Sequence, residues 1–485
     1  MPNDARERGR GRGGPPVTPI RITAVVVPLV AVIAGLAGIL GGGLSWPGSQ
    51  ASSAAPVATT PGASAPPAGS PAPSPTRLPT PAPTPSPSPT PSPIPSADLQ
   101  ATLDRLRARL SIPGVSVAML WDDGRSWTGA SGMADVAGKV PMTPDRGFAL
   151  ASISKTFTAA VVLELVGEGR LGLDEPVAPL LPAFKLDRRI TVRMLLDHTS
   201  GLPDFFLNPA INAPLLASPN STWTAARTWR YVTGKRPVPG TAWGYSNSNY
   251  LLLGELVTAV TGRPLATEVR TRLLDPLGLA STWYQVAEPP VAPLTVPYRL
   301  VRTGSGTYRA VRVGAGGQVM PFRSVVTAAA GAGSVAATAI DTARWMQAFA
   351  GGRVLTPAMQ RAMLADAAFT AALKARIVYG LGLQVVLVDG RQALGHSGRY
   401  LGYRDVVRYL PYDGVTIAVL TNQNLVDPTT IASALLNVVL PPLPAPSPSS
   451  SPSPSGSPPA SPGTSGSALP STGPTPSVTA SAAGG

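Results

Sequence analysis

The chain has 485 residues, among them 57 prolines, 50 glycines and no cysteine, and its 39 basic and 25 acidic residues give a formal net charge of +14. The absence of cysteine excludes a disulfide scaffold, a thiol nucleophile and any cysteine-ligated metal, and it leaves the redox compartment open. The positive charge of residues 97–440 is diffuse and contains no run of like charges, so we expect no nucleic-acid partner.

The chain begins with a short basic segment followed by an uncharged apolar one. Residues 1–21 carry five arginines against Asp4 and Glu7, and residues 22–44 carry no charge. As a helix the apolar segment would span about 34 Å, against about 30 Å of bilayer hydrocarbon. We therefore predict a cytoplasmic tail over residues 1–21 and a transmembrane anchor over residues 22–44. A cleaved signal peptide is the alternative, and in both cases the rest of the chain is exported.

The prolines are concentrated in two segments, one on each side of a core of ordinary composition. Residues 47–95 and 441–485 together hold 30 of the 57 prolines and a single charged residue, Arg77. Such segments bury too little apolar surface to offset the entropy that ordering would cost. We predict an extended Pro/Ser/Thr-rich linker over residues 45–96, a disordered tail over residues 441–485 and one large domain over residues 97–440.

Within this domain, the spacing of apolar residues and the turn residues predict strands near both ends and helices between them. The expected strands cover residues 114–120, 126–131, 381–388, a return strand towards His396, 403–410 and 415–420, and the expected helices include residues 154–168 and 429–440. Asp-Gly turn signals separate three strand pairs. This order predicts an α/β fold of the α+β type, in which an antiparallel sheet joins the two ends of the domain, helices flank it and a helical lobe is inserted.

Ser152 and Lys155 form the first candidate for chemistry. If Ser152 opens the helix predicted over residues 154–168, Lys155 lies about one turn away on the same face. A serine hydroxyl becomes a nucleophile when a nearby base takes its proton, and a partly desolvated lysine can be that base. The S-x-x-K spacing taken alone is weak evidence for a catalytic site, because serine is common.

Tyr245 and Asn247 form the second candidate. A tyrosine beside an ammonium group can be drawn towards phenolate and serve as a base, and an asparagine amide can orient a substrate carbonyl and accept from Lys155. The structural alternative is a helix start in which Tyr245 belongs to the core and Ser246 or Asn247 caps the helix.

The third candidate is the segment that runs from His396 through Ser397 and Gly398 to Arg399. Gly398 would let a substrate backbone approach the strand edge, and a strand N–H near Arg399 could form an oxyanion hole with the N–H of Ser152. The other histidine, His198, is interpreted as a loop residue held by hydrogen bonds. With two distant histidines and no cysteine, we expect no metal and no cofactor.

The three segments occur in the order S-x-x-K, Y-x-N and H-x-G, and this pattern resembles serine β-lactamase-like and penicillin-binding hydrolases. The surrounding motifs LLDHTSGLPD, PGTAWGYSNSNY, YGLGLQV and GHSGRYLGYR extend the resemblance over most of residues 99–440. The chain looks closest to the class C-like branch, and its H-S-G is similar to Streptomyces-type D-alanyl-D-alanine carboxypeptidases. His396 departs from the lysine that is usual in class C β-lactamases. Gln384 stands where such carboxypeptidases carry an arginine for the substrate carboxylate.

The resemblance implies a β-lactamase/transpeptidase-like fold and an acyl-enzyme mechanism. Ser152, Lys155 and Tyr245 would be catalytic, and Asn247, His396, Ser397, Gly398 and Arg399 would bind the substrate, with His396 and Ser397 binding or protonating the departing end. The expected activity is that of an exported, membrane-anchored D-alanyl-D-alanine carboxypeptidase-like enzyme acting on cell-wall peptides. Alternatives are an esterase or D-amino-acid amidase, a β-lactamase, and a penicillin-binding sensor or scaffold that does not turn over.

Overall fold

The computed structural model describes residues 93–304, 308–314 and 322–443. The chain divides into two units, Met1–Pro441 and Pro442–Gly485, and every helix and strand described here lies in the first. Residues 1–92, which include the predicted cytoplasmic tail, the anchor and most of the linker, lie outside the described residues, as does the predicted tail beyond Leu443.

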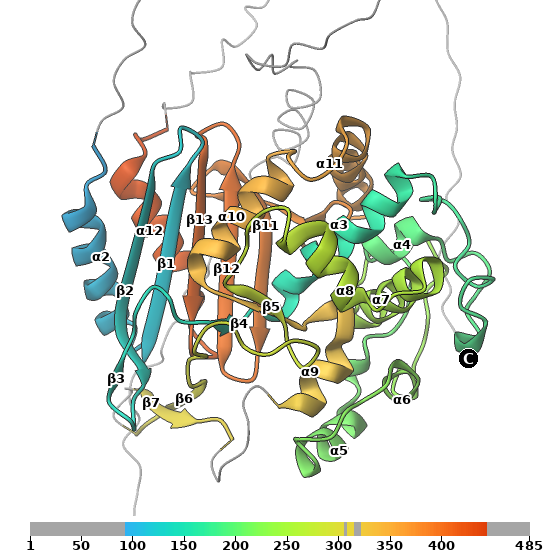
Figure 1. The fold of residues 1–485 in the computed structure, drawn as a ribbon, viewed down its shortest axis with the longest axis horizontal. Coiled ribbons are helices and arrows are strands. Elements are labelled where there is room, and N and C mark those ends of the chain that lie inside the picture. The colour runs from blue at the N-terminus through green and yellow to red at the C-terminus, as the bar shows by residue number, and fades with distance from the viewer. Residues whose placement is uncertain (1–92, 305–307, 315–321, 444–485) are drawn as a thin grey trace, which may run out of the picture. The chain divides into compact units, whose positions relative to one another are not determined.

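An antiparallel sheet forms the centre of the fold (Figure 1). Its strand order is β3-β2-β1-β13-β12-β11-β10-β9. The strands are β1 (Gly114–Trp121), β2 (Ser126–Asp135), β3 (Val140–Pro141), β9 (Val378–Tyr379), β10 (Gln384–Val388), β11 (Arg391–Tyr400), β12 (Tyr403–Leu410) and β13 (Val415–Thr421). The N-terminal hairpin joins the C-terminal strands through β1 and β13, where Val115 pairs with Thr421. The predicted antiparallel sheet joining both ends of the domain is therefore confirmed.

Helices cover both faces of this sheet. On one face lie α2 (Ser96–Arg109) and α12 (Thr429–Val439), where Leu99, Leu103 and Leu435 are fully buried against strand residues such as Ile417. On the other face lie α3 (Ser154–Gly167), α10 (Ala339–Ala350) and α11 (Pro357–Ala372). The predicted helices over residues 154–168 and 429–440 are both present, each ending one residue earlier than expected.

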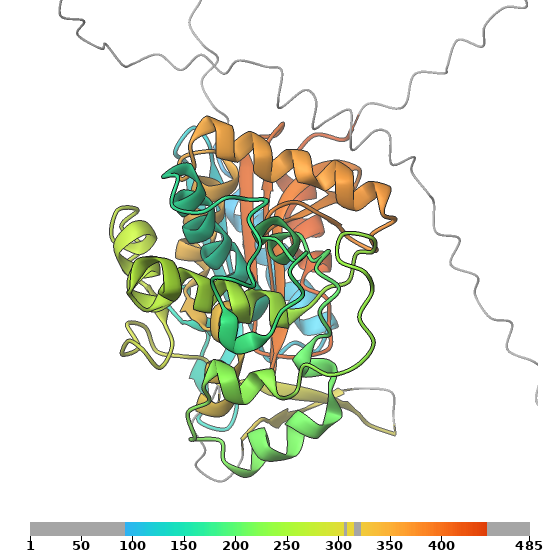
Figure 2. The same cartoon turned by 90° about the vertical axis from the view of Figure 1, so that its right-hand side faces the viewer.

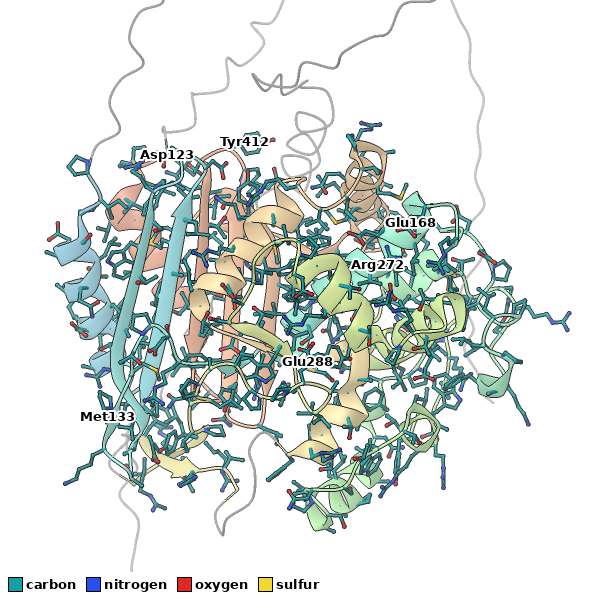
Figure 3. The ribbon with its side chains drawn as sticks, in the orientation of Figure 1. Asp123, Met133, Glu168, Arg272, Glu288 and Tyr412 are labelled. Atoms are coloured by element: carbon teal, nitrogen blue, oxygen red, sulfur yellow. The ribbon has the colours of Figure 1, made fainter. Side chains whose placement is uncertain are left out.

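The middle of the chain forms the helical lobe that the sequence predicts, which faces the viewer in Figure 2. Its helices are α4 (Val192–Leu196), α5 (Asn212–Ala217), α6 (Ala225–Trp229), α7 (Asn247–Thr261), α8 (Leu265–Val269) and α9 (Arg323–Ala329). Arg272 forms ion pairs with Glu168 and Glu268 and so ties the end of α3 to the α8 segment; Glu168 and Arg272 are labelled in Figure 3.

Two small sheets were not predicted. One contains β4 (Phe148–Ala149), β8 (Val335–Ala337) and β5 (Thr282–Tyr284), and the other pairs β6 (Tyr298–Arg302) with β7 (Tyr308–Arg312). The strand expected over residues 381–388 also begins later, at Gln384. Gly382 has φ +96°, a left-handed conformation that breaks the extended chain, and a Cβ at this position would lie 2.1 Å from the Cβ of Ala159.

Candidate active site

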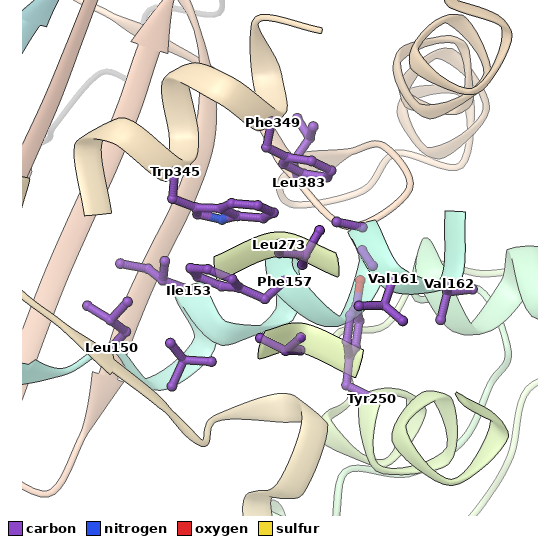
Figure 4. Close-up of a cluster of buried hydrophobic side chains, with 14 of the residues drawn as sticks. Leu150, Ile153, Phe157, Val161, Val162, Tyr250, Leu273, Trp345, Phe349 and Leu383 are labelled. Carbon is purple, nitrogen blue, oxygen red and sulfur yellow. The ribbon is translucent and has the colours of Figure 1, made fainter. Parts of the chain in front are cut away.

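Ser152 lies in a tight turn between β4 and α3. The turn is a single 3₁₀ segment over Ala151–Ile153, and Ala151 has φ +47°, a left-handed conformation that is strained for a residue with a side chain. The core holds this turn in place, because Leu150 and Ile153 are fully buried on either side of Ser152 (Figure 4). Phe157, one turn into α3, stacks on Trp345 of α10 with ring centroids 4.1 Å apart. The serine is therefore presented by a rigid support.

Lys155 lies in the first turn of α3 and is completely buried. Its Nζ donates to Ser152 Oγ at 3.0 Å, to Asn247 Oδ1 at 2.7 Å and to the carbonyl oxygen of Ala332 at 2.9 Å. Burial lowers the pKa of Lys155 to about 7, while the negative charge of Asp204 opposes this shift. At neutral pH a substantial fraction of Lys155 is therefore uncharged and able to accept the proton of Ser152.

Tyr245 is held between Lys155 and His198. Lys155 Nζ lies 5.0 Å from the centroid of the Tyr245 ring, and the His198 ring packs against it with centroids 4.3 Å apart. Burial raises the pKa of Tyr245, and a hydrogen bond with Ser152 only partly offsets this shift. The expected shift of Tyr245 towards phenolate is therefore wrong for this structure, because burial dominates and the negative charge of Asp204 adds to its effect. Tyr245 remains a phenol at neutral pH.

His198 has the structural role that the sequence predicted. It follows α4 in the loop, and its Nδ1 accepts from the backbone N–H of Ser246 at 3.1 Å. Burial and the nearby Lys155 hold its pKa well below the usual range. The neutral ring thus supports Tyr245 and connects the loop after α4 to the start of α7.

Asn247 is the first residue of α7, but its side chain does not cap the helix. Its Oδ1 accepts from Lys155, and its Nδ2 donates to Asp204 Oδ2 at 2.7 Å. Asp204 was not singled out from the sequence, although it ends the motif LLDHTSGLPD. The carboxylate fixes the orientation of the Asn247 amide and places a negative charge near Lys155.

The position of His396 does not suit the role expected from the sequence, which was to bind or protonate the departing end of the substrate. It is 1% exposed, its Nε2 lies 2.8 Å from Tyr379 Oη, and its Nδ1 lies 2.6 Å from the carbonyl oxygen of Ser397. Because a carbonyl can only accept, Nδ1 carries the proton and Nε2 accepts from Tyr379. Burial lowers the pKa of His396 to about 3, so the ring is neutral and both nitrogens are engaged. This arrangement cannot protonate a leaving group near neutral pH.

Gly398 lets β11 approach the turn that carries Ser152. A Cβ at this position would lie 2.2 Å from the carbonyl oxygen of Leu150 and 3.4 Å from the Cβ of Ala151. The glycine therefore serves close packing of two protein segments, whereas the sequence suggested an approach by substrate backbone. It brings the strand that continues to Arg399 beside Ser152.

Beyond Gly395, the edge of β11 is open within the described part of the chain. Gln384 is the first residue of β10 and pairs with Gly395, so the stretch from His396 to Tyr400 pairs only with β12. Ser397 and Arg399 are exposed along this stretch. A substrate backbone can therefore be placed against β11 next to Ser152.

A cavity of about 420 Å³ opens beside Ser152. Asn247, Asp204 and Arg399 are among its polar lining residues. Most of its wall is apolar and is contributed by Phe206, Leu207, Leu215, Leu216, Val325 and Leu401. The structure thus brings Ser152, Lys155, Tyr245 and Asn247 into one group, places Arg399 on the same cavity and leaves His396 buried behind Tyr245.

Comparison with known proteins identifies the family of the chain. A protein-family model described as Beta-lactamase matches residues 99–439. Penicillin-binding protein 4 of Amycolatopsis lactamdurans is 30% identical over 348 residues, which cover 67% of this chain and 85% of that protein. A D-aminopeptidase of Brucella anthropi is 29% identical over 297 residues, which cover 60% of this chain and 52% of that enzyme, so the match spans about half of its length.

A solved structure of a D-amino acid amidase has the same fold. The D-amino acid amidase from Ochrobactrum anthropi SV3, complexed with L-phenylalanine amide, matches with a TM-score of 0.60 and 25% identity, covering 71% of this chain and 97% of that one. The match to the family model extends from α2 to α12 and includes all three sequence motifs and the eight-stranded sheet. The chain therefore belongs to the Beta-lactamase family, whose members with this fold include serine hydrolases named as penicillin-binding proteins, D-aminopeptidases and D-amino acid amidases.

Proposed function

We propose that this protein is a serine peptidase of the D-alanyl-D-alanine carboxypeptidase type, which cleaves cell-wall peptides through an acyl-enzyme. The observation that carries the proposal is the set of three hydrogen bonds from Lys155, which joins the Ser152 hydroxyl to Asn247. The similarity to a penicillin-binding protein and to enzymes named for D-configured substrates supports this substrate class.

In the proposed acylation, neutral Lys155 takes the proton of Ser152 while Oγ bonds to the carbonyl carbon of the substrate. The backbone N–H groups of Ser152 and Arg399 stabilise the oxyanion, to which one such donor typically contributes about 3 kcal/mol. The C–N bond then breaks, and the departing nitrogen receives a proton from the Tyr245 phenol, which Lys155 replenishes. Water releases the acyl group by the reverse sequence, and Asn247 orients the acyl part through its amide.

A second candidate function rests on the apolar cavity beside Ser152. Its volume of about 420 Å³ exceeds what a methyl side chain fills, and its wall suits a bulky apolar group on the acyl side of the bond. This observation favours an amidase or esterase that releases large apolar acyl groups.

We also propose that the hydrolase domain is exported and held at the cell membrane by residues 22–44, with secretion after signal cleavage as the alternative. Support comes from the sequence: the uncharged segment follows a basic tail and precedes a proline-rich linker. In the part of the chain that the structure describes, no helix is long and apolar enough to cross a membrane.

Ser152→Ala tests the proposal. Because Oγ is the group that is acylated, we expect this variant to lose labelling by fluorescent penicillin and by fluorophosphonate, with an unchanged melting temperature. Full labelling of the variant would contradict the assignment.

A substrate panel on the wild-type protein separates the activities. Steady release of D-alanine from a diacyl-D-Ala-D-Ala peptide is expected for the carboxypeptidase. A single burst would instead indicate a sensor, and turnover confined to esters or amino acid amides would indicate the second candidate.

A further inference from the structure

The hairpin formed by β6 and β7 carries arginines that the proposed chemistry does not use. Between Glu288 and Asp341 the sequence has five arginines and no acidic residue. Four of these arginines lie on the two strands of the hairpin, which forms a sheet of its own at one end of the domain (Figure 1). The fold thus concentrates positive charge that is diffuse along the sequence.

Three of the four arginines have no opposite charge beside them. Arg299, Arg302 and Arg309 are exposed, and within the described residues none of them forms an ion pair. Arg312 differs, because the carboxylate of Asp135 attracts it at the root of the hairpin. We call the three uncompensated arginines the arginine patch.

The pairing of the two strands determines how the patch is arranged. Arg299 pairs with Val311, two positions beyond Arg309, so Arg299 and Arg309 are diagonal neighbours on one face of the hairpin. Tyr298 and Leu300, which point to the opposite face, are buried against the domain. Diagonal neighbours lie about 7–8 Å apart, and two guanidinium groups at that distance repel each other. An anion that binds both groups relieves this repulsion.

The root of the hairpin adjoins the active-site cavity. A Cβ on Gly402, in the turn between β11 and β12, would lie 2.8 Å from the Cβ of Pro297 and 2.8 Å from the backbone nitrogen of Tyr298. Leu401, the residue before this glycine, lines the cavity beside Ser152. A polymer held by the hairpin therefore stays close to the cleft in which Ser152 acts.

The hairpin lies far from the point where residues 93–95 lead into α2. Arg107, near the end of α2, donates to Ser131 of β2, and Tyr298 Oη accepts from the backbone N–H of Val136, just past the end of β2. The end of α2 and the root of the hairpin therefore share one end of the sheet (Figure 1). The start of α2 lies about 20 Å away, because its 14 residues rise about 1.5 Å each. Under the export proposed above, this arrangement favours a partner outside the membrane over the lipid surface.

We propose that the arginine patch binds an anionic cell-wall polymer that carries phosphate diesters, and so holds the hydrolase beside its substrate. Guanidinium groups bind phosphate oxygens through paired, charge-assisted hydrogen bonds, and a chain of regularly spaced phosphates contacts several arginines at once. The patch goes beyond the proposed function, because it takes no part in acylation. Charges on an exposed strand can also serve to keep it from pairing with other chains, and that role requires no particular anion.

The test measures binding of the full-length protein, in a neutral detergent, to immobilised poly(glycerol phosphate). The hairpin variant carries Arg299→Gln, Arg302→Gln and Arg309→Gln together. Because these side chains are exposed and lie outside the catalytic group, we expect this variant to keep the melting temperature and the penicillin labelling of the wild type.

The matched control removes the same charge from other parts of the surface. It carries Arg188→Gln, Arg361→Gln and Arg376→Gln, three exposed positions that form no ion pair within the described residues. A comparison of the two variants therefore separates the arginine patch from the net charge of the domain.

We expect the wild type to bind the polymer with an affinity that falls as salt rises from about 50 mM to about 200 mM, because binding releases counterions. Loss of three phosphate contacts should weaken binding by about 10- to 100-fold at about 150 mM salt and lower the slope of log affinity against log salt by about two. The control variant should weaken binding by less than about twofold, because its charges lie outside the patch and are screened from the polymer. If the hairpin variant does not fold, Arg309→Gln decides, with an expected weakening of about three- to fivefold.

A wild type that does not bind the polymer, or equal weakening in the two variants, would overturn the inference. A second assay uses vesicles of phosphatidylcholine and phosphatidylglycerol. Because residues 22–44 are the same in all proteins tested, a difference in vesicle binding reports on the hairpin. A loss confined to vesicles would make the lipid surface the partner and overturn the polymer assignment. Self-association of the hairpin variant with unchanged polymer binding would show that the arginines serve only to protect the strand edge.

Discussion

At the scale of single residues, Lys155 is governed by two opposing influences. Burial favours its neutral form, and the carboxylate of Asp204 favours its charged form. The proton transfer proposed from Ser152 requires the neutral form, so we expect this balance to set the pH at which activity appears. Asp204 also accepts a hydrogen bond from the Asn247 amide. The same carboxylate therefore affects both the pKa of Lys155 and the orientation of Asn247.

Asp204→Asn tests this coupling. Removing the negative charge makes the Lys155 ammonium less favourable, so its pKa falls below about 7 and the neutral fraction at a given pH rises. The ascending limb of kcat/KM against pH should therefore move to lower pH. Its plateau should fall by about tenfold, because Asn247 is less firmly oriented. A pH–rate profile measures both effects, and a limb that stays in place or moves to higher pH would contradict the assignment.

The sequence predicted Ser152 and Lys155 because their relation is local: three positions on one helical turn. It did not predict Asp204, whose partner Asn247 is 43 positions away, or the Ala332 carbonyl, which is 177 positions from Lys155. The sequence could not show that His396 is neutral either, because its burial depends on Tyr379, which comes from another strand. Residue types and spacing were thus enough to propose Ser152 as nucleophile and Lys155 as its base, whereas the charges and pKa shifts around them depend on contacts made only in the folded lobe.

At the scale of elements, the strands whose bounds were predicted best are long and largely buried on both faces. Tyr403–Leu410 begins and ends where the sequence indicated, because both its faces are buried and a turn follows it. The β4, β8 and β5 strands have two or three residues each, too few for any periodic signal. The β6–β7 pair contains four arginines at strand positions, which resemble a solvated loop in sequence. The closeness of β11 to the Ser152 turn could likewise be recognised only in the fold.

Gly398→Ala tests this closeness. The added Cβ would lie 2.2 Å from the Leu150 carbonyl oxygen, so β11 or the turn must move. Overpacking of this kind costs about 1–3 kcal/mol, whereas a misplacement of about 1 Å can lower the rate by about 100-fold. We expect kcat/KM to fall by about that factor and the melting temperature by only a few degrees.

Gly304→Ala is the matched control, since a Cβ there meets no atom of the described residues within 4 Å, and it should leave both quantities unchanged. Equal activity of Gly398→Ala and the control would show that the strand does not need its present position.

At the scale of the whole molecule, every helix and strand of the described residues lies in the stretch from α2 to α12, these two included. Ile94 packs against the cluster formed by α2, α12 and the sheet, and its carbonyl oxygen accepts from the N–H of Ser96 at 2.8 Å. A truncated protein should therefore retain residues 94–440. We expect its melting temperature to match that of the full chain within about 2 °C and its kcat/KM to be equal, measured by calorimetry and with the substrate panel. A clear loss in either quantity would show that residues 1–93 or 441–485 contribute to the domain.

The pairing of β1 with β13 determines when this domain can fold. Val115 is among the first core residues made and Thr421 among the last, and they are neighbours in the finished sheet. Until Thr421 has been synthesised, β1 has only β2 beside it, and a lone hairpin has little stability in water. Contacts this distant along the chain also make folding slow. We therefore expect the nascent chain to stay open during synthesis. This agrees with the export proposed above, because an open chain can pass through a channel that admits only unfolded polypeptide and fold on the far side.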